Sequence, residues 1–205
     1  IGLTTQVLRG STASTDGSVV VIKSDTSTDL RRYARDTNTG VYIQTHSVAT
    51  TVGSTPYSSI IILGNYVYAF DDNNTVVRCY RYDLATLANE TLCTMPSIDT
   101  SSNNYYINTW TDGTFIYLCQ QKASTTGYKL AISGTTLTTS ATSTCAVDVD
   151  TKEKIQFMFD GTSTYQVSTV TDGSFTIKKA TDIYFVASTT TTKLISYELS
   201  STRGC

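Results

Sequence analysis

A glycine turn that leads into an apolar strand is clearest at Leu63-Gly64-Asn65-Tyr66-Val67-Tyr68-Ala69-Phe70. The same pattern occurs at Asp16-Gly17-Ser18-Val19-Val20-Val21-Ile22 and at Asp112-Gly113-Thr114-Phe115-Ile116-Tyr117-Leu118. The three glycines are separated by 47 and then 49 positions. Self-similarity at such a period is the signature of a repeat protein, so we expect three equivalent hairpins in consecutive sheets.

A second signal lies downstream of each glycine turn. It reads Arg32-Tyr33-Ala34-Arg35-Asp36-Thr37-Asn38-Thr39 in the first unit and Cys79-Tyr80-Arg81-Tyr82-Asp83-Leu84-Ala85-Thr86 in the second. Weaker matches cover residues 129–136 and 196–202. In each, an alternating strand ends in an Asp or Ser whose side chain can accept hydrogen bonds from the following backbone. The pattern predicts a second tight turn in every unit.

Each unit therefore reads as four short strands separated by turns. In the second unit the expected strands are 58–63, 66–71, 76–82 and 89–95. In the third unit they are 105–111, 114–119, 127–132 and 136–144. Four antiparallel strands every 40–50 residues is the blade period of a β-propeller.

On these residues the chain resembles β-propeller proteins in general, and its Tyr82-Asp83-Leu84-Ala85-Thr86 turn is similar to those of kelch-like blades. The double glycine of kelch blades and the Trp-Asp ending of other blades are both missing. The resemblance implies an all-β, propeller-like array of four or five four-stranded antiparallel blades in one repeat domain, residues 1–205. The expected units are approximately 15–57, 58–104, 105–150 and 151–205. A β-sandwich is the alternative, since it would accept the same strands without requiring the repeat.

The last quarter fits the period less well. Asp160-Gly161 keeps the spacing, but the apolar segments 183–187 and 193–199 arrive about twenty residues late, and Asp172-Gly173 adds a further turn signal. We interpret this region as a fourth blade with an insertion, or as a fourth blade and an incomplete fifth. A strand from residues 4–8 would close the ring if it joined the last blade.

Composition limits the possible functions. The chain has 205 residues, a formal net charge of -2, 40 Thr, 23 Ser and 14 Tyr. Without a basic stripe the usual footprint of nucleic-acid binding is missing, and no apolar run is long enough for a membrane span. Hydroxyl-rich strands with little charge are typical of extracellular, cell-surface and virion proteins, which is the localisation we expect.

Residues suited to catalysis are few. His46 is the only histidine and has no nucleophile motif beside it, so we expect it to be structural. Paired carboxylates are the remaining route, as in glycosidases. The candidates are Asp71, Asp72, Asp112, Asp160 and Asp172, and most of them stand in turn sequences. We therefore predict no catalytic residue, no metal site, no cofactor and no enzymatic activity.

Tyr105, Tyr106 and Trp110 form an aromatic cluster at the start of the third unit. Exposed aromatic rings stack on sugars, so these residues are the candidate ligand-binding site. Strand alternation offers a second interpretation, in which Tyr106 and Trp110 share one face and pack into the core.

Cys79 and Cys93 flank the turn at 83–87 at equal distance from Thr86 and should lie opposite each other on paired strands. A disulfide is possible there if the pair is of the close, non-hydrogen-bonded type. Buried free thiols are the alternative.

The sequence favours a non-enzymatic recognition or structural module that binds a protein partner or a glycan through its loops. Two alternatives stay open at this point. One is a carbohydrate-active enzyme with paired aspartates, and the other is an architectural subunit of a larger assembly such as a phage tail, capsid or surface layer.

Overall fold

Four antiparallel sheets of four strands each follow one another along the chain, and we call them blades 1 to 4. The computed structural model describes residues 8–24, 29–52, 59–72, 76–98, 107–120, 126–144, 155–159, 164–169, 175–179 and 191–192. In every blade the spatial order of the strands is their order in the chain. The prediction of an all-β, propeller-like array is confirmed, and a two-sheet sandwich is excluded by this topology.

The strands are short and evenly spaced. Blade 1 contains β1 (Leu8–Ala13), β2 (Val19–Ser24), β3 (Asp29–Arg35) and β4 (Tyr42–Ala49). Blade 2 contains β5 (Ser59–Leu63), β6 (Tyr66–Asp72), β7 (Val77–Asp83) and β8 (Thr91–Leu92). Blade 3 contains β9 (Ile107–Thr111), β10 (Ile116–Gln120), β11 (Thr126–Ser133) and β12 (Thr136–Thr144). Blade 4 contains β13 (Ile155–Phe159), β14 (Thr164–Thr169), β15 (Phe175–Lys179) and β16 (Thr191–Thr192).

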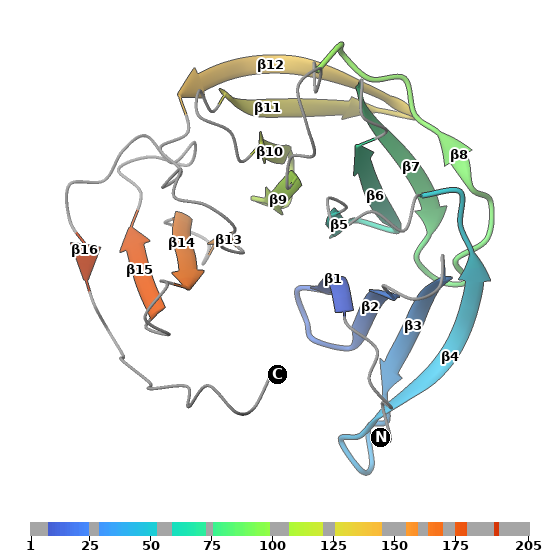
Figure 1. Cartoon of the computed structure of the whole chain (residues 1–205). Coiled ribbons are helices and arrows are strands. Elements are labelled where there is room, and N and C mark those ends of the chain that lie inside the picture. Colours follow the sequence, from blue (N-terminus) through green and yellow to red (C-terminus); the bar gives the residue numbers. More distant parts are fainter. Residues whose placement is uncertain are drawn as a thin grey trace.

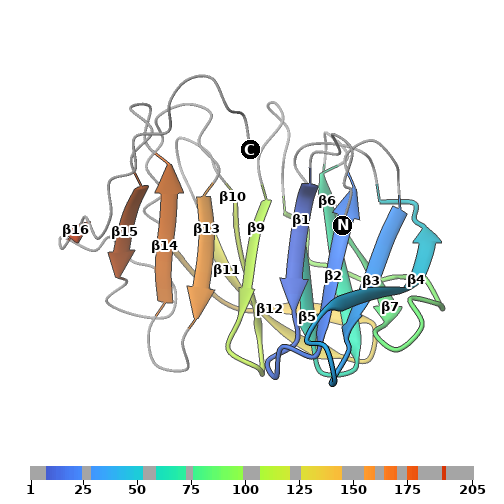
Figure 2. The same cartoon turned by 90° about the horizontal axis from the view of Figure 1, so that it is seen from below.

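The blades are arranged around a common axis (Figure 1). The first strand of each blade is innermost, and β1, β5, β9 and β13 are neighbours in that order. Figure 2 shows the same inner strands from the side, running along the axis. Within the described ranges, no helix has the length and apolar character needed to cross a bilayer.

The predicted glycine turns occupy equivalent positions. Gly17, Gly64 and Gly113 each join the first strand of a blade to its second, and each has a positive φ, 68°, 58° and 88° respectively. Residues other than glycine rarely adopt a positive φ, which explains why each repeat has glycine at this position. The predicted second turn is also found, because Asp36 directly follows the third strand of blade 1 and Asp83 ends the third strand of blade 2.

The structure adds detail at both ends of the repeat. Blade 1 begins at Leu8, not near residue 15, because β1 pairs with β2 and therefore belongs to the first blade. Residues 4–7 lie outside the described part. In the last quarter, β14 and β15 pair as antiparallel neighbours on either side of Asp172-Gly173, as expected of a hairpin, and Asp172-Gly173 itself lies outside the described residues. The segments predicted at 183–187 and 193–199 lie outside the described residues.

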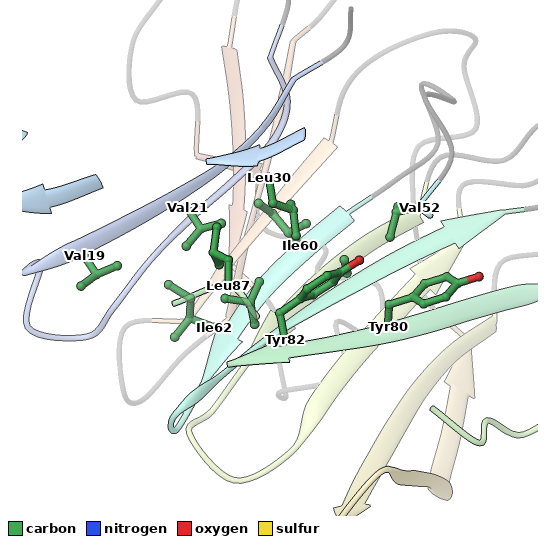
Figure 3. Close-up of a cluster of buried hydrophobic side chains, with 11 residues drawn as sticks. Val19, Val21, Leu30, Val52, Ile60, Ile62, Tyr80, Tyr82 and Leu87 are labelled. Atoms are coloured by element: carbon green, nitrogen blue, oxygen red, sulfur yellow. The ribbon is translucent and has the colours of Figure 1, made fainter. Parts of the chain in front are cut away.

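Apolar side chains fill the space between neighbouring blades. The core between blades 1 and 2, which we call seam 1–2, includes Val21, Leu30, Ile60, Val67 and Tyr82 (Figure 3). The core between blades 2 and 3, seam 2–3, includes buried side chains from both sheets: Phe70, Cys79, Ile116, Leu118 and Leu130. Alternation along each strand sends one set of side chains to one seam and the other set to the next.

A hydrogen-bonded network also joins blades 1 and 2. The Tyr82 hydroxyl lies 2.5 Å from Thr50 Oγ1 and donates to Glu90 Oε2 at 2.5 Å. Glu90 further accepts from the Thr51 backbone N–H at 3.1 Å. Thr50 and Thr51 follow the last strand of blade 1, whereas Tyr82 and Glu90 belong to blade 2. The network therefore attaches the start of the segment that links the two blades, at Thr50 and Thr51, to blade 2.

Blades 2 and 3 are joined differently, by a backbone strap at Thr94. This residue follows β8, and its N–H donates to the Thr135 carbonyl at 3.0 Å. Its own carbonyl accepts from the Leu137 N–H at 2.8 Å, so Thr94 pairs in parallel with Thr136. The strap covers part of the outer edge of β12, the kind of edge that otherwise offers unpaired backbone groups to other chains.

Candidate functional site

Three blades place a cation at the same point of the sheet. In each, a basic residue of the third strand lies opposite the residue four positions after the turn glycine. The three pairs are Val21 with Arg32, Tyr68 with Arg81, and Tyr117 with Lys129. The repeat therefore provides an internal comparison of how one cation position is used.

In blades 2 and 3 the cation packs on an aromatic ring. The Arg81 guanidinium lies 4.3 Å from the ring centre of Tyr66, and the Lys129 ammonium lies 3.9 Å from that of Phe115. Arg81 also donates from Nη1 to the carbonyl of Gly134 at 2.7 Å, in the turn between β11 and β12 of blade 3. Such stacking and charge-assisted hydrogen bonding satisfy the cation within the protein.

In the part of the chain that the structure describes, Arg32 has neither an aromatic ring nor a backbone carbonyl as its partner. The position of the aromatic ring, two residues after the turn glycine, holds Val19 in blade 1. Arg32 donates from Nη1 to Thr45 Oγ1 at 2.6 Å, but its Nε is buried without a hydrogen-bond partner. Among the described residues, no carboxylate forms an ion pair with this guanidinium. An incompletely satisfied, partly buried cation is unfavourable unless a ligand completes it.

A pocket opens beside Arg32, where blades 1 and 2 meet. Its volume is about 490 Å³, within the range of small-molecule sites. We call it the seam pocket, and it is lined by Arg32, Asn65, Tyr66, Asp83, Leu84, Ala85 and Thr86. Arg32 comes from blade 1 and the other six residues from two turns of blade 2, so only the packing of the blades creates the site.

Backbone hydrogen bonds hold the wall opposite Arg32 in place. The Leu87 N–H donates to the Asp83 carbonyl at 2.7 Å, and the Leu84 N–H donates to the Asn65 carbonyl at 2.9 Å. The Asp83 carboxylate accepts from Asn89 Nδ2 at 2.5 Å through Oδ2. Leu87 has a φ of 56° and is fully buried, which anchors the turn in the seam 1–2 core. The polar groups of the turn are thus positioned before any ligand arrives.

Carboxylates elsewhere are occupied by the fold. Hydrogen bonds from Ser14 and Ser18 lower the pKa of Asp16 to about 2, and backbone N–H groups of Thr39 and Asn38 lower the pKa of Asp36. Burial raises the pKa of Asp112, but hydrogen bonds from Phe115, Thr114 and Tyr117 outweigh it and leave that pKa below its usual value.

Glu90 shows the same balance, because burial raises its pKa and the donors Thr51 and Tyr82 bring it below normal. Each of these groups is held as an anion, which does not suit a general acid.

The carboxylates proposed as catalysts do not come together in the described part of the chain. Asp71 is buried and accepts from Arg78 Nη2 at 2.5 Å, whereas Asp112 caps the turn between β9 and β10. The Asp72 side chain and residues Asp160 and Asp172 lie outside the described part. Among described residues, no cluster of three or more His, Cys, Asp or Glu side chains is arranged to hold a metal.

The aromatic cluster predicted as a glycan platform is not an exposed surface at Trp110. This side chain is only 3% exposed and stacks on Tyr117, with ring centres 5.5 Å apart and planes 16° apart. The alternative interpretation, core packing, is what the structure shows for Trp110. Tyr105 and Tyr106 lie outside the described residues.

Cys79 and Cys93 face each other as expected, and both thiols are free and buried, which is the second of the two predicted arrangements. The Cys93 N–H donates to the Cys79 carbonyl at 2.8 Å. The pair is therefore hydrogen-bonded, with a wider Cα separation than the non-hydrogen-bonded type on which the disulfide depended. Burial raises the pKa of Cys79, and a hydrogen bond from Cys79 lowers that of Cys93.

His46 is half-buried on β4, opposite Arg32, and its Nδ1 has no hydrogen-bond partner. It does not line the seam pocket.

Sequence reasoning missed the seam pocket. The sequence indicates only a turn role for Asp83. An alignment of the repeat units on their second turns makes Arg32 equivalent to Cys79. The strand pairing instead makes Arg32 equivalent to Arg81, because Arg32 lies four residues before Asp36 whereas Arg81 lies only two residues before Asp83. A basic residue opposite the fourth position after each turn glycine is the signal that could have revealed it.

No protein-family model matches the sequence, and no curated protein matches it either. Solved structures do resemble it. An engineered GH43 glycoside hydrolase with endo-xylanase and exo-arabinofuranosidase activity has a TM-score of 0.61 and 13% identity, and the match covers 92% of this chain and 41% of that one. The WD40 domain of Toxoplasma gondii coronin has a TM-score of 0.53 and 13% identity, covering 84% of this chain and 44% of that domain.

A putative 6-phosphogluconolactonase from Bacteroides uniformis has a TM-score of 0.50 and 13% identity, covering 92% and 72%. These neighbours are β-propeller proteins of varied function, and at such low identity they show the fold alone. The chain spans less than half the length of the hydrolase and of the coronin domain.

Proposed function

We propose that this chain is a non-enzymatic recognition module of an extracellular, cell-surface or virion protein, which binds a glycan or a protein partner. The composition supports the location, since the chain carries 40 Thr and 23 Ser with a net charge of only -2. Within the β-propeller class, the turn at Tyr82 to Thr86 favours kelch-like blades, and this finer assignment is part of the proposal.

The observation that carries the proposal is the seam pocket. It combines the incompletely satisfied guanidinium of Arg32, on β3, with the Asp83 carboxylate and the Asn65 amide. Backbone hydrogen bonds hold the two turns that carry Asp83 and Asn65 in place. A few fixed polar groups in a concave site are what specific binding requires. Hydrolysis requires more, namely a second carboxyl at catalytic distance with a raised pKa. In the described part of the chain, every carboxyl whose pKa is shifted has it lowered.

A glycan array read in parallel with a hydrolysis assay tests the proposal. We expect retention of a subset of glycans, with no shortened product detectable by mass spectrometry. Turnover of a glycoside that is abolished by an Asp→Asn or Glu→Gln exchange would establish the carbohydrate-active enzyme instead. Self-association in analytical ultracentrifugation, with no retention of any glycan or partner protein, would establish the architectural subunit.

A further inference from the structure

Arg32, which lines the seam pocket, lacks the carbonyl partner that the equivalent Arg81 has. In seam 2–3, the Arg81 guanidinium reaches a carbonyl oxygen in the third-to-fourth-strand turn of the next blade, Gly134 O at 2.7 Å. In seam 1–2, Arg32 faces the corresponding turn of blade 2, Asp83 to Thr86, across the pocket. No hydrogen bond joins Arg32 to that turn. A ligand oxygen placed in the pocket would accept a hydrogen bond from Arg32, as the Gly134 carbonyl does from Arg81.

The chemistry of Arg32 selects the kind of oxygen. A guanidinium presents its donors in a planar fork that matches the two oxygens of a carboxylate, and a charged acceptor makes the stronger hydrogen bonds. Burial of Nε without a partner adds to the preference for an anion, because the cation is partly withdrawn from water. The first feature of the ligand is therefore a negatively charged planar group.

The opposite wall limits the charge and adds hydroxyl contacts. The Asp83 carboxylate disfavours a second negative charge, which argues against phosphorylated or multiply sulfated ligands. Its Oδ1 can accept hydrogen bonds, the Asn65 amide can donate and accept, and the Thr86 hydroxyl can donate. Leu84 and Ala85 supply apolar surface between these groups. A singly charged carboxylate on a compact body with several hydroxyls and apolar C–H faces fits this wall.

We propose that the seam pocket binds an acidic monosaccharide unit, with its carboxylate on Arg32 and its hydroxyls on Asp83, Asn65 and Thr86. The inference rests on the proposed recognition function and names the ligand class within it. Uronic acids and sialic acids share this chemistry. A protein partner that offers a glutamate carboxylate would lack the ring hydroxyls that Asp83 and Asn65 are placed to meet.

Titration calorimetry with matched ligands tests the inference. The probes are methyl glucuronoside, the methyl ester of the same sugar, N-acetylneuraminic acid methyl glycoside and methyl glucoside. We expect one or both free acids to bind at least tenfold more tightly than the ester and the neutral sugar. Added salt should weaken binding of the acids, because their attraction to Arg32 is electrostatic. Which acid binds more tightly distinguishes the uronic from the sialic source.

Variants locate the site. Arg32→Gln should weaken binding of the acids at least tenfold, Arg32→Lys should have a smaller effect, and Arg35→Gln, an exposed exchange on the same strand outside the pocket, should have none. Asp83→Asn should strengthen binding of a sulfated sugar, since it removes a repulsive charge, and should weaken the hydroxyl contacts of the acidic sugars, because an amide oxygen is a weaker acceptor than a carboxylate. Melting curves for every variant separate lost binding from lost folding.

Two outcomes would overturn the inference while leaving the recognition function intact. One is glycan or protein binding that Arg32→Gln leaves unchanged. The other is tighter binding of a glutamate-containing peptide than of any acidic sugar, with both abolished by Arg32→Gln. Failure to bind any glycan or protein would count against the proposed function itself.

Discussion

The same boundary between blades is built twice in this molecule, and the two versions treat their polar groups differently. Seam 2–3 satisfies its arginine internally, because Arg81 stacks on Tyr66 and donates to the Gly134 carbonyl. Seam 1–2 has an arginine at the equivalent position, Arg32, but neither the ring nor the carbonyl contact. The proposed binding site lies at the seam in which these internal contacts are missing. One position keeps its charge and loses its internal partners.

A second pair of equivalent residues strengthens the comparison. Phe70 lies six positions after its turn glycine and contributes a fully buried ring to seam 2–3. Lys23 lies six positions after Gly17 and is also fully buried, on the strand of blade 1 that faces seam 1–2. At this position seam 2–3 therefore has a buried aromatic ring, whereas seam 1–2 has a buried lysine beside an apolar core.

The largest expected effect on stability comes from removing the Phe70 ring from seam 2–3. Phe70→Ala should lower the free energy of unfolding by about 3–5 kcal/mol, since it removes a buried ring and leaves a cavity. Chemical denaturation measures the loss. Leu92→Ala is the control, because Leu92 is 59% exposed and should change stability by less than about 0.5 kcal/mol. A small effect at Phe70 would mean that seam 2–3 is not a packed core.

The hydrogen-bonded network of seam 1–2 should give an intermediate effect. Tyr82→Phe removes the hydroxyl that contacts Thr50 and Glu90 but keeps the buried ring, and should cost about 1–2 kcal/mol. The effect should depend on pH. The folded-state pKa of Glu90 lies below its usual value, so this carboxylate stabilises the fold above the unfolded-state pKa and loses that contribution as the pH falls.

Denaturation of wild type and Tyr82→Phe from neutral pH to about pH 3 should therefore show the difference shrinking in acid. Glu90→Gln serves as the reference, because it removes the titrating group and should remove most of this pH dependence. A difference that stays constant with pH would contradict the assigned role of the Tyr82–Glu90 hydrogen bond.

The two arginines should give the smallest but most specific effect. Arg81→Gln removes a cation–π contact and a hydrogen bond to Gly134, and should cost about 1 kcal/mol. Arg32→Gln removes only the bond to Thr45 and relieves a poorly satisfied charge, so its stability should stay within about 0.5 kcal/mol of wild type. Equal losses at both positions, measured by denaturation under the same conditions, would show that the two seams use their arginines alike.

The turns were predictable because their chemistry is local. Gly17, Gly64 and Gly113 need a positive φ, and Asp36 accepts from the N–H groups of Asn38 and Thr39 just beyond it. Strand 8–13 was missed as the start of blade 1, since it has no apolar alternation and is recognisable only from its pairing with β2.

The seam pocket was not predictable for a different reason. Arg32 and Asp83 are far apart in sequence. Arg32 lies four residues before Asp36 but Arg81 only two before Asp83, so an alignment on these turns hides the equivalence of the two arginines. Trp110 shows the converse, since an aromatic cluster looks the same in sequence whether it stacks on a ligand or on Tyr117.

The strap at Thr94 is synthesised before the strand edge that it covers. Thr94 leaves the ribosome before Thr136, the residue with which it pairs on the outer edge of β12. A nascent chain emerges from its N-terminal end, so the strap is already available when β12 is made. We expect this part of the outer edge of blade 3 to be covered as soon as blade 3 forms. An open strand edge invites pairing with neighbouring nascent chains, and a cover that is synthesised first shortens the time during which that can happen.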